Sequence, residues 1–184
     1  EITFEVTDKQ TKAPITDAVI TVKNSKNEVV TPVDGKYTLK EGTYDVTITA
    51  TGYKTLSSKI DIGADSSKIS VELEAFVAVT GIDLTLDKVM KTKEYTLADY
   101  VTITPETATK KTIVWSAAET LPDGVTLADG KLTISADAAE NAQIKLRATI
   151  ANGALNADGK TEQNYTKDFT LTVTKYLATI TFTH

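Results

Sequence analysis

The chain contains no cysteine, which excludes disulfide bonds, thiolate metal sites and cysteine nucleophiles. Its one histidine, His184, is the last residue, so we expect no general-base catalysis by histidine. No serine lies in a G-x-S-x-G nucleophile elbow, and no glycine-rich turn leads into a predicted helix as nucleotide-binding fingerprints require. The sequence therefore predicts no catalytic residue, no resident metal and no cofactor, and it identifies no ligand-binding residue.

Arginine and long apolar segments are also scarce. Arg147 is the one arginine among 20 basic residues, and the net charge is -5. Because proteins that read nucleic acids favour arginine for bases and phosphates, we expect no nucleic-acid partner. No apolar run approaches the roughly 18 residues of a membrane span, so we expect no membrane insertion in this segment.

Threonine, in contrast, is abundant, with 33 among 184 residues, and it suits the solvent-facing side of a strand. Apolar and polar residues alternate almost everywhere, as in "ITFEVTD", where Ile2, Phe4 and Val6 share one face. Turn-rich pieces such as "KNSKNE" and "GADSSK" separate these runs. The pattern predicts an all-β chain folded as two tandem antiparallel β-sandwiches.

The spacing of the alternating runs changes at "ELEAFVAVTG", between Glu72 and Gly81. We therefore expect one sandwich over residues 1–76 and a second over residues 77–176, joined by a short and stiff linker. Residues 177–184, "LATITFTH", echo the opening "EITFEV", which predicts the start of a further module or a tail. The chain reads as a piece of a longer protein.

The sequence Asp-Gly-Lys occurs three times, starting at Asp34, Asp129 and Asp158. Asp-Gly is a strong hairpin signal because both positions tolerate positive φ. An alternating strand follows the first two copies, which predicts two hairpin turns. The third copy lies in the polar stretch from Asn152 to Tyr165, which we expect to be a long exposed hairpin loop and the place to look for function.

The first segment resembles the carboxypeptidase-regulatory-like, or transthyretin-like, β-sandwich. The resemblance rests on "PITDAVITV", "DGKYTL" and "GTYDVTITATGY" and covers residues 1 to about 74. It implies a prealbumin-like fold and a non-catalytic module appended to larger secreted or surface proteins. The segment is also similar to the Cna B-type repeat of Gram-positive surface proteins, which implies a lysine–asparagine isopeptide bond between the first and last strands. Glu5 and Thr7 stand where that lysine would be, and "SKISVELEA" has no asparagine, so we expect no such bond.

The second segment resembles a bacterial Ig-like domain of the group 2 kind found in intimin and invasin. The resemblance rests on "VTGIDL", "ITPETATKKTIVWS" and the later "ADGKLTIS" hairpin. It implies an immunoglobulin-like sandwich. The family's usual closing pattern is replaced by "ENAQIKLRATIANG", and the polar stretch before "KDFTLTVT" is an insertion.

Aromatic residues offer the main alternative to a purely structural reading. Trp115, in "TIVWSA", is expected in the core beside Ile113, and the competing hypothesis is a platform on which a sugar stacks. Tyrosines at three positions fit an inner strand face: Tyr37, Tyr44 and Tyr53. Four others are less constrained and would bind a glycan if they formed an exposed cluster: Tyr95, Tyr100, Tyr165 and Tyr176.

Calcium is a further hypothesis. An EF-type loop with Gly159 at its sixth position would place Ala154 first and Tyr165 twelfth, and neither can be a ligand there. Extracellular calcium sites also lie between tandem modules, and Asp61, Asp83 and Asp87 are the candidates for such a junction.

Two functional hypotheses follow. The first is a structural or adhesive tandem module of a bacterial cell-surface or secreted protein, acting as a spacer or a protein-interaction segment. Its partners would be other modules of the same polypeptide and a host or matrix protein. The second is an accessory, glycan-binding module of a secreted polysaccharide-degrading enzyme, with a cell-wall or plant polysaccharide as partner.

Overall fold

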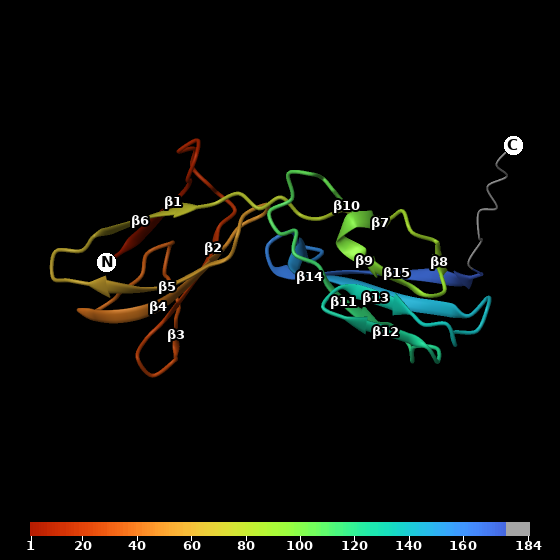
Figure 1. The fold of residues 1–184 in the computed structure, drawn as a ribbon. Coiled ribbons are helices and arrows are strands. Elements are labelled where there is room, and N and C mark those ends of the chain that lie inside the picture. The colour runs from red at the N-terminus through yellow and green to blue at the C-terminus, as the bar shows by residue number, and fades with distance from the viewer. Residues whose placement is uncertain (176–184) are drawn as a thin grey trace, which may run out of the picture. The chain divides into compact units, whose positions relative to one another are not determined.

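The computed structural model describes residues 1–175, and over that range the chain is all-β apart from one short 3-10 helix. This confirms the predicted fold class. The chain forms two compact units (Figure 1). The first unit contains Glu1–Ala78 and Ala154–Gln163, and the second contains Val79–Gly153 and the described residues from Asn164 on. Residues 177–184, with the predicted further module or tail, lie outside the described residues.

The first unit contains a four-stranded and a two-stranded sheet. The larger sheet has the antiparallel order β3-β2-β4-β5, and β1 pairs with β6 in the smaller one. The strands are β1 (Thr3–Asp8), β2 (Val19–Lys23), β3 (Val29–Val30), β4 (Gly42–Thr49), β5 (Leu56–Ile62) and β6 (Lys68–Leu73).

The core of the first unit lies between these sheets. Alternate residues of β4, Val46 and Ile48, are buried with Val22 of β2 and Leu73 of β6, while the threonines between them face outward or lie half-buried. Tyr37 is buried as well, and its hydroxyl donates to the backbone oxygen of Ile20 at 2.9 Å. The period-two alternation of the sequence therefore corresponds to the two faces of each strand.

One strand pairing of the first unit differs from the prediction. β1 and β6 lie side by side (Figure 1) and run parallel, with Thr3 opposite Lys68 and Asp8 opposite Leu73. The prediction of purely antiparallel sandwiches was wrong here. β2, β3, β4 and β5 lie between β1 and β6 in the sequence. No tight hairpin turn therefore joins the two strands and makes them antiparallel.

The second unit contains three sheets, of order β10-β7, β12-β13-β9 and β11-β14-β15-β8. Its elements are β7 (Gly81–Leu84), β8 (Lys88–Met90), β9 (Lys93–Thr96), the 3-10 helix η1 (Leu97–Tyr100), β10 (Val101–Thr104), β11 (Val114–Ala117), β12 (Val125–Ala128), β13 (Lys131–Ile134), β14 (Gln143–Leu155) and β15 (Glu162–Thr174). The ends of β14 and β15 near their shared turn belong to the first unit. A second parallel pair joins β8 to the end of β15, with Thr172 opposite Lys88.

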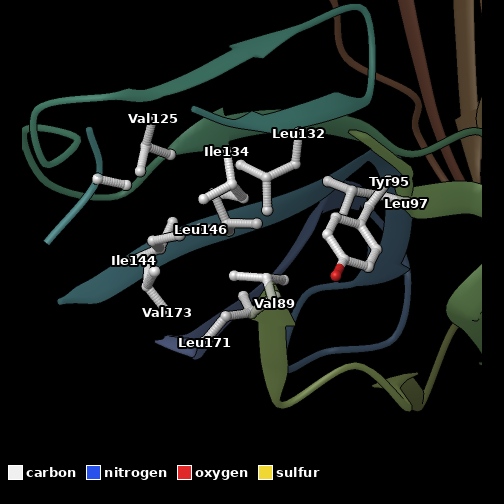
Figure 2. Packing of buried hydrophobic residues seen from close by; sticks show 11 residues of the cluster. Val89, Tyr95, Leu97, Val125, Leu132, Ile134, Ile144, Leu146, Leu171 and Val173 are labelled. Atoms are coloured by element: carbon white, nitrogen blue, oxygen red, sulfur yellow. The ribbon is translucent and has the colours of Figure 1, made fainter. Parts of the chain in front are cut away.

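The main core of the second unit is formed by aliphatic side chains from β8, β13, β14 and β15. Val89, Ile134, Leu146 and Leu171 are almost fully buried, and their side chains gather in one cluster (Figure 2). Tyr95 closes this cluster, and its hydroxyl accepts the backbone N–H of Met90 at 2.7 Å. The core is thus built from residues of strands that lie far apart in the sequence.

Two of the three Asp-Gly-Lys copies form the predicted hairpin turns. Asp34 and Asp129 both have φ 49°, and the glycines that follow them both have φ 75°. Two positive φ values in succession are the signature of the type I′ turn, whose twist matches that of the flanking strands. In the first copy, Val33 and Lys36 bond to each other through both backbone pairs at 2.9 Å.

The polar stretch from Asn152 to Tyr165 is not the long loop that the sequence predicted. β14 continues to Leu155 and β15 begins at Glu162, so six residues, 156–161, join two long strands. Gly153 is buried, and a Cβ at its position would lie 2.6 Å from Cγ2 of Ile150. Ala151 and Asn152 are both exposed, and Asn152 has φ 50°, so the alternation loses its phase within β14 and the sequence did not reveal the rest of the strand. Over the described range, no helix is long and apolar enough to cross a membrane.

Candidate functional site

A groove of about 460 Å³ lies between β10 and β11 in the second unit. Its volume falls within the range of about 300–1,000 Å³ that is usual for small-molecule sites. In the described part of the chain, β10 pairs with β7 alone and β11 with β14 alone, so both strands are sheet edges. The apolar wall consists of Val101, Ile103, Ile113, Val114 and Trp115.

Trp115 contributes to the core and to this groove at once. It packs against both apolar clusters of the second unit, and its ring centroid lies 5.9 Å from that of Phe169. The side chain is half-buried, and it lines the groove beside Gly130. The predicted core role is therefore correct for one side of the residue, while another side remains accessible to a ligand.

Polar groups flank the apolar wall of the groove. Asp129 and Gly130 belong to the second Asp-Gly-Lys turn, and a Cβ on Gly130 would lie 3.6 Å from Cδ1 of Trp115. Lys111 lies at the groove and donates to the backbone oxygen of Glu106 at 3.1 Å. One exposed carboxylate, one ammonium group and an indole edge can together bind a polar ligand that also has an apolar face.

Within residues 1–175, the less constrained tyrosines Tyr95, Tyr100 and Tyr165 do not form the exposed cluster that glycan binding would use. Tyr95 is 7% exposed and packs at 6.0 Å from Tyr100. Tyr165 packs against a different apolar cluster and donates its hydroxyl to the backbone oxygen of Thr80 at 3.1 Å. Tyr176 lies outside the described residues. The sequence could not reveal this separation, because it does not show which apolar cluster each strand packs against.

Two of the three candidate calcium ligands have other side-chain partners, while the backbone oxygen of Asp87 accepts the N–H of Thr172 at 2.9 Å. Asp61 accepts a hydrogen bond from the hydroxyl of Thr43 at 2.6 Å, and Asp83 forms an ion pair with Lys167 at 3.1 Å. Over residues 1–175, no group of three or more histidine, cysteine or acidic side chains gathers in a way that could hold a metal ion.

The third Asp-Gly-Lys copy forms a packed turn of the first unit. Asn156 Oδ1 accepts the N–H groups of Lys160 and Thr161, at 3.3 Å and 3.0 Å. The carbonyl of Gly159 accepts the N–H of Gly52 at 3.0 Å, and Nζ of Lys160 donates to the backbone oxygen of Asp17 at 2.8 Å. The turn is thus held by bonds within its own unit, and the predicted long exposed hairpin loop is corrected to a short turn, while its role as the place to look for function stays a prediction.

Asp8, at the end of β1, holds the turn that follows this strand. Its carboxylate accepts the N–H groups of Thr11 at 2.6 Å and Gln10 at 2.8 Å, and these bonds, that of Thr11 above all, lower the pKa of Asp8. The hydroxyl of Tyr53 also donates to it. Hydrogen bonds to the ionised form therefore outweigh the opposing effect of desolvation.

Three further carboxyl groups have lowered pKa values. The Thr51 hydroxyl has the largest effect on the pKa of Asp17, the Lys68 ammonium on that of Glu5, and the Arg147 guanidinium on that of Asp168. Arg147 contacts both oxygens of Asp168, at 2.7 Å and 2.8 Å. Glu5, which stands where the Cna B-type lysine would be, forms an ion pair with Lys68 at 2.6 Å.

We expect the chain to lose stability in acid. The pKa values of these four groups lie lower in the folded chain than in the unfolded chain, where they are about 3.9 for aspartate and 4.3 for glutamate. Their contribution is complete above the unfolded values and is lost as the pH falls through them toward the folded values. Thermal melts should give a lower Tm at pH 3 than at pH 6. Asp8→Asn, which cannot ionise, should show a smaller drop, and equal Tm values for the native chain would contradict the prediction.

Comparison with known proteins finds a family model that matches part of the chain. Residues 2–78 match the family model of the CarboxypepD_reg-like domain, which supports the resemblance proposed for the first segment. The match ends where the contiguous part of the first unit ends, and it does not include residues 154–163. The Ig-like assignment of the second unit stays a prediction.

Among solved structures, the chain is similar to the crystal structure of domains 4 and 5 of the S-layer protein SbsC. The sequences are 14% identical, and the similarity covers 91% of this chain and 78% of that chain with a TM-score of 0.33. A similarity of this degree does not establish a shared fold. No curated protein matches the chain.

Proposed function

We propose that the chain is a non-catalytic structural or adhesive segment of a larger bacterial cell-surface or secreted protein, in which it acts as a spacer or protein-interaction segment. The observation that carries the proposal is the match of residues 2–78 to the CarboxypepD_reg-like domain. The resemblance of the second unit to bacterial Ig-like domains agrees with it. Other modules of the same polypeptide and a host or matrix protein are the proposed partners.

The groove beside Trp115 favours a second candidate, an accessory glycan-binding module of a secreted polysaccharide-degrading enzyme. Trp115 lines the groove, and an indole ring can stack on the apolar face of a sugar ring, while Asp129 can accept hydrogen bonds from the sugar hydroxyls. The first candidate requires no ligand in this groove, whereas the second requires one.

Affinity electrophoresis of the full chain in native gels, with and without cell-wall or plant polysaccharides, separates the two candidates. The structural role predicts equal mobility in all gels. Retardation that is lost in Asp129→Asn would support the glycan-binding role and overturn the first candidate. This variant suits the test because asparagine also adopts the positive φ of the type I′ turn while it removes the carboxylate charge.

A further inference from the structure

β1 and β6 are the first and last strands of the segment Glu1–Ala78, and they form a parallel ladder. β1 and β6 pair in parallel over six residues each, from Thr3 opposite Lys68 to Asp8 opposite Leu73. The N–H of Thr3 donates to Ser67 at 3.0 Å, and the N–H of Lys9 donates to Leu73 at 2.8 Å. Backbone bonds therefore extend over the whole length of the pair.

The direction of this pairing decides how it responds to tension along the chain. The polypeptide enters β1 at Glu1 and leaves β6 toward Val77. Because the strands are parallel, tension between these two points pulls β1 and β6 along their axes in opposite directions. All the bonds of the ladder are then strained at the same time, and none of them can break first without the others being displaced.

The antiparallel pair β4–β5 in the same unit offers the opposite geometry. Gly42 lies opposite Ile62 at one end of that ladder, and Leu56 lies opposite Ile48 at its other end. Tension between Glu41 and Asp65, which precede β4 and follow β5, would open this ladder from one end, one bond at a time. A single backbone hydrogen bond has a net stabilising effect of only about 0.5–1.5 kcal/mol, so sequential opening meets little resistance.

Side chains of the parallel pair anchor it to the core. Val6 of β1 and Leu73 of β6 are buried in the apolar cluster of the first unit, and Ile69 and Val71 of β6 pack against it. Sliding β1 along β6 would therefore also pull Val6 out of the core. The ion pair between Glu5 and Lys68 crosses the two strands but is exposed, so its contribution is small.

We propose that the β1–β6 pair is a mechanical clamp, through which the first unit resists tension applied along the chain. This inference rests on the proposed role as a non-catalytic segment of a longer polypeptide, because only a segment within such a chain carries tension. The second unit does not share this arrangement, because its first strand, β7, pairs antiparallel with β10, and its parallel pair β8–β15 spans three residues.

Single-molecule force spectroscopy on the full chain tests the clamp. The chain has no cysteine, so pairs of introduced cysteines give unique attachment points. One variant carries Glu1→Cys and Val77→Cys and loads the parallel pair in shear. The matched control carries Glu41→Cys and Asp65→Cys and opens β4–β5 from one end. All four positions are exposed, so we expect both variants to keep the native Tm.

We expect the mean unfolding force between positions 1 and 77 to be at least about twice that between positions 41 and 65, because several bonds must break together instead of one after another. Forced unfolding depends on the unfolding barrier along the pulling direction, so the difference should exist at equal thermal stability. Equal forces, or a lower force between positions 1 and 77, would overturn the clamp. Such a result would leave the proposed structural role intact, whereas retention by a polysaccharide gel would overturn that role and leave the clamp standing.

Discussion

Replacing Ile48 by alanine should lower the free energy of unfolding by about 2–5 kcal/mol, which would be the largest effect of a single truncation in the first unit. Ile48 is fully buried near the C-terminal end of β4, and it pairs with Ile20 of β2 on one side and with Leu56 of β5 on the other. The substitution removes buried apolar surface and leaves a cavity that the two neighbouring strands can only partly close.

Urea unfolding followed by far-UV circular dichroism measures this change, and hydrogen exchange of the β2 and β4 amides localises it to the first unit. Val29→Ala is the matched control, because Val29 lies on the short strand β3 and is 60% exposed. The control should change the unfolding free energy by no more than about 0.5 kcal/mol. A loss for Ile48→Ala as small as that of the control would contradict the packing of the core.

Replacing Gly124 by alanine should be the most damaging glycine substitution in the second unit, with an expected loss of about 2–5 kcal/mol. Gly124 has φ 76°, which costs an L-residue about 1–2 kcal/mol. A Cβ there would also lie 2.7 Å from the backbone nitrogen of Ala138 and 2.6 Å from the hydroxyl of Ser135. Relief of such contacts needs a backbone shift, and overpacking of this kind costs about 1–3 kcal/mol more.

Gly130→Ala separates these two causes. Gly130 has nearly the same φ, 75°, but a Cβ at this position would meet only Cδ1 of Trp115, at an ordinary 3.6 Å. It should therefore lose only the backbone component, about 1–2 kcal/mol. Tryptophan fluorescence during urea unfolding reports on the second unit, which contains the one tryptophan. Equal losses for the two variants would show that the close contacts at Gly124 relax without cost.

Local patterns in the sequence predicted the parts of the fold that depend on neighbouring residues. The alternation in "TYDVTITA" places Val46 and Ile48 in the core, and the two Asp-Gly turns at Asp34 and Asp129 have the expected positive φ values. Both results come from the preferences of a few consecutive residues. They need no knowledge of which strand lies beside which.

The features that the sequence could not predict depend on partners that lie far away along the chain. Alternation shows which face of β1 is buried, but it does not show that β1 runs parallel to β6. The extension of β14 through Gly153 was missed because the alternation loses its phase at Ala151 and Asn152, so the sequence has no period-two signal there. The groove was missed because its lining residues come from separate parts of the sequence. Trp115 comes close to Asp129 only through tertiary folding.

The chain passes between its two units three times, because residues 154–163 belong to the first unit. This connectivity bears on whether residues 1–78 keep all their contacts when they are separated from the rest of the chain. A fragment that ends at Ala78 would carry the whole family match, yet the N–H of Gly52 would lose the carbonyl of Gly159, and Asp17 would lose Lys160. A fragment that carries the family match alone would therefore lack contacts that the full chain provides, and we expect it to be less stable than the same residues within the full chain.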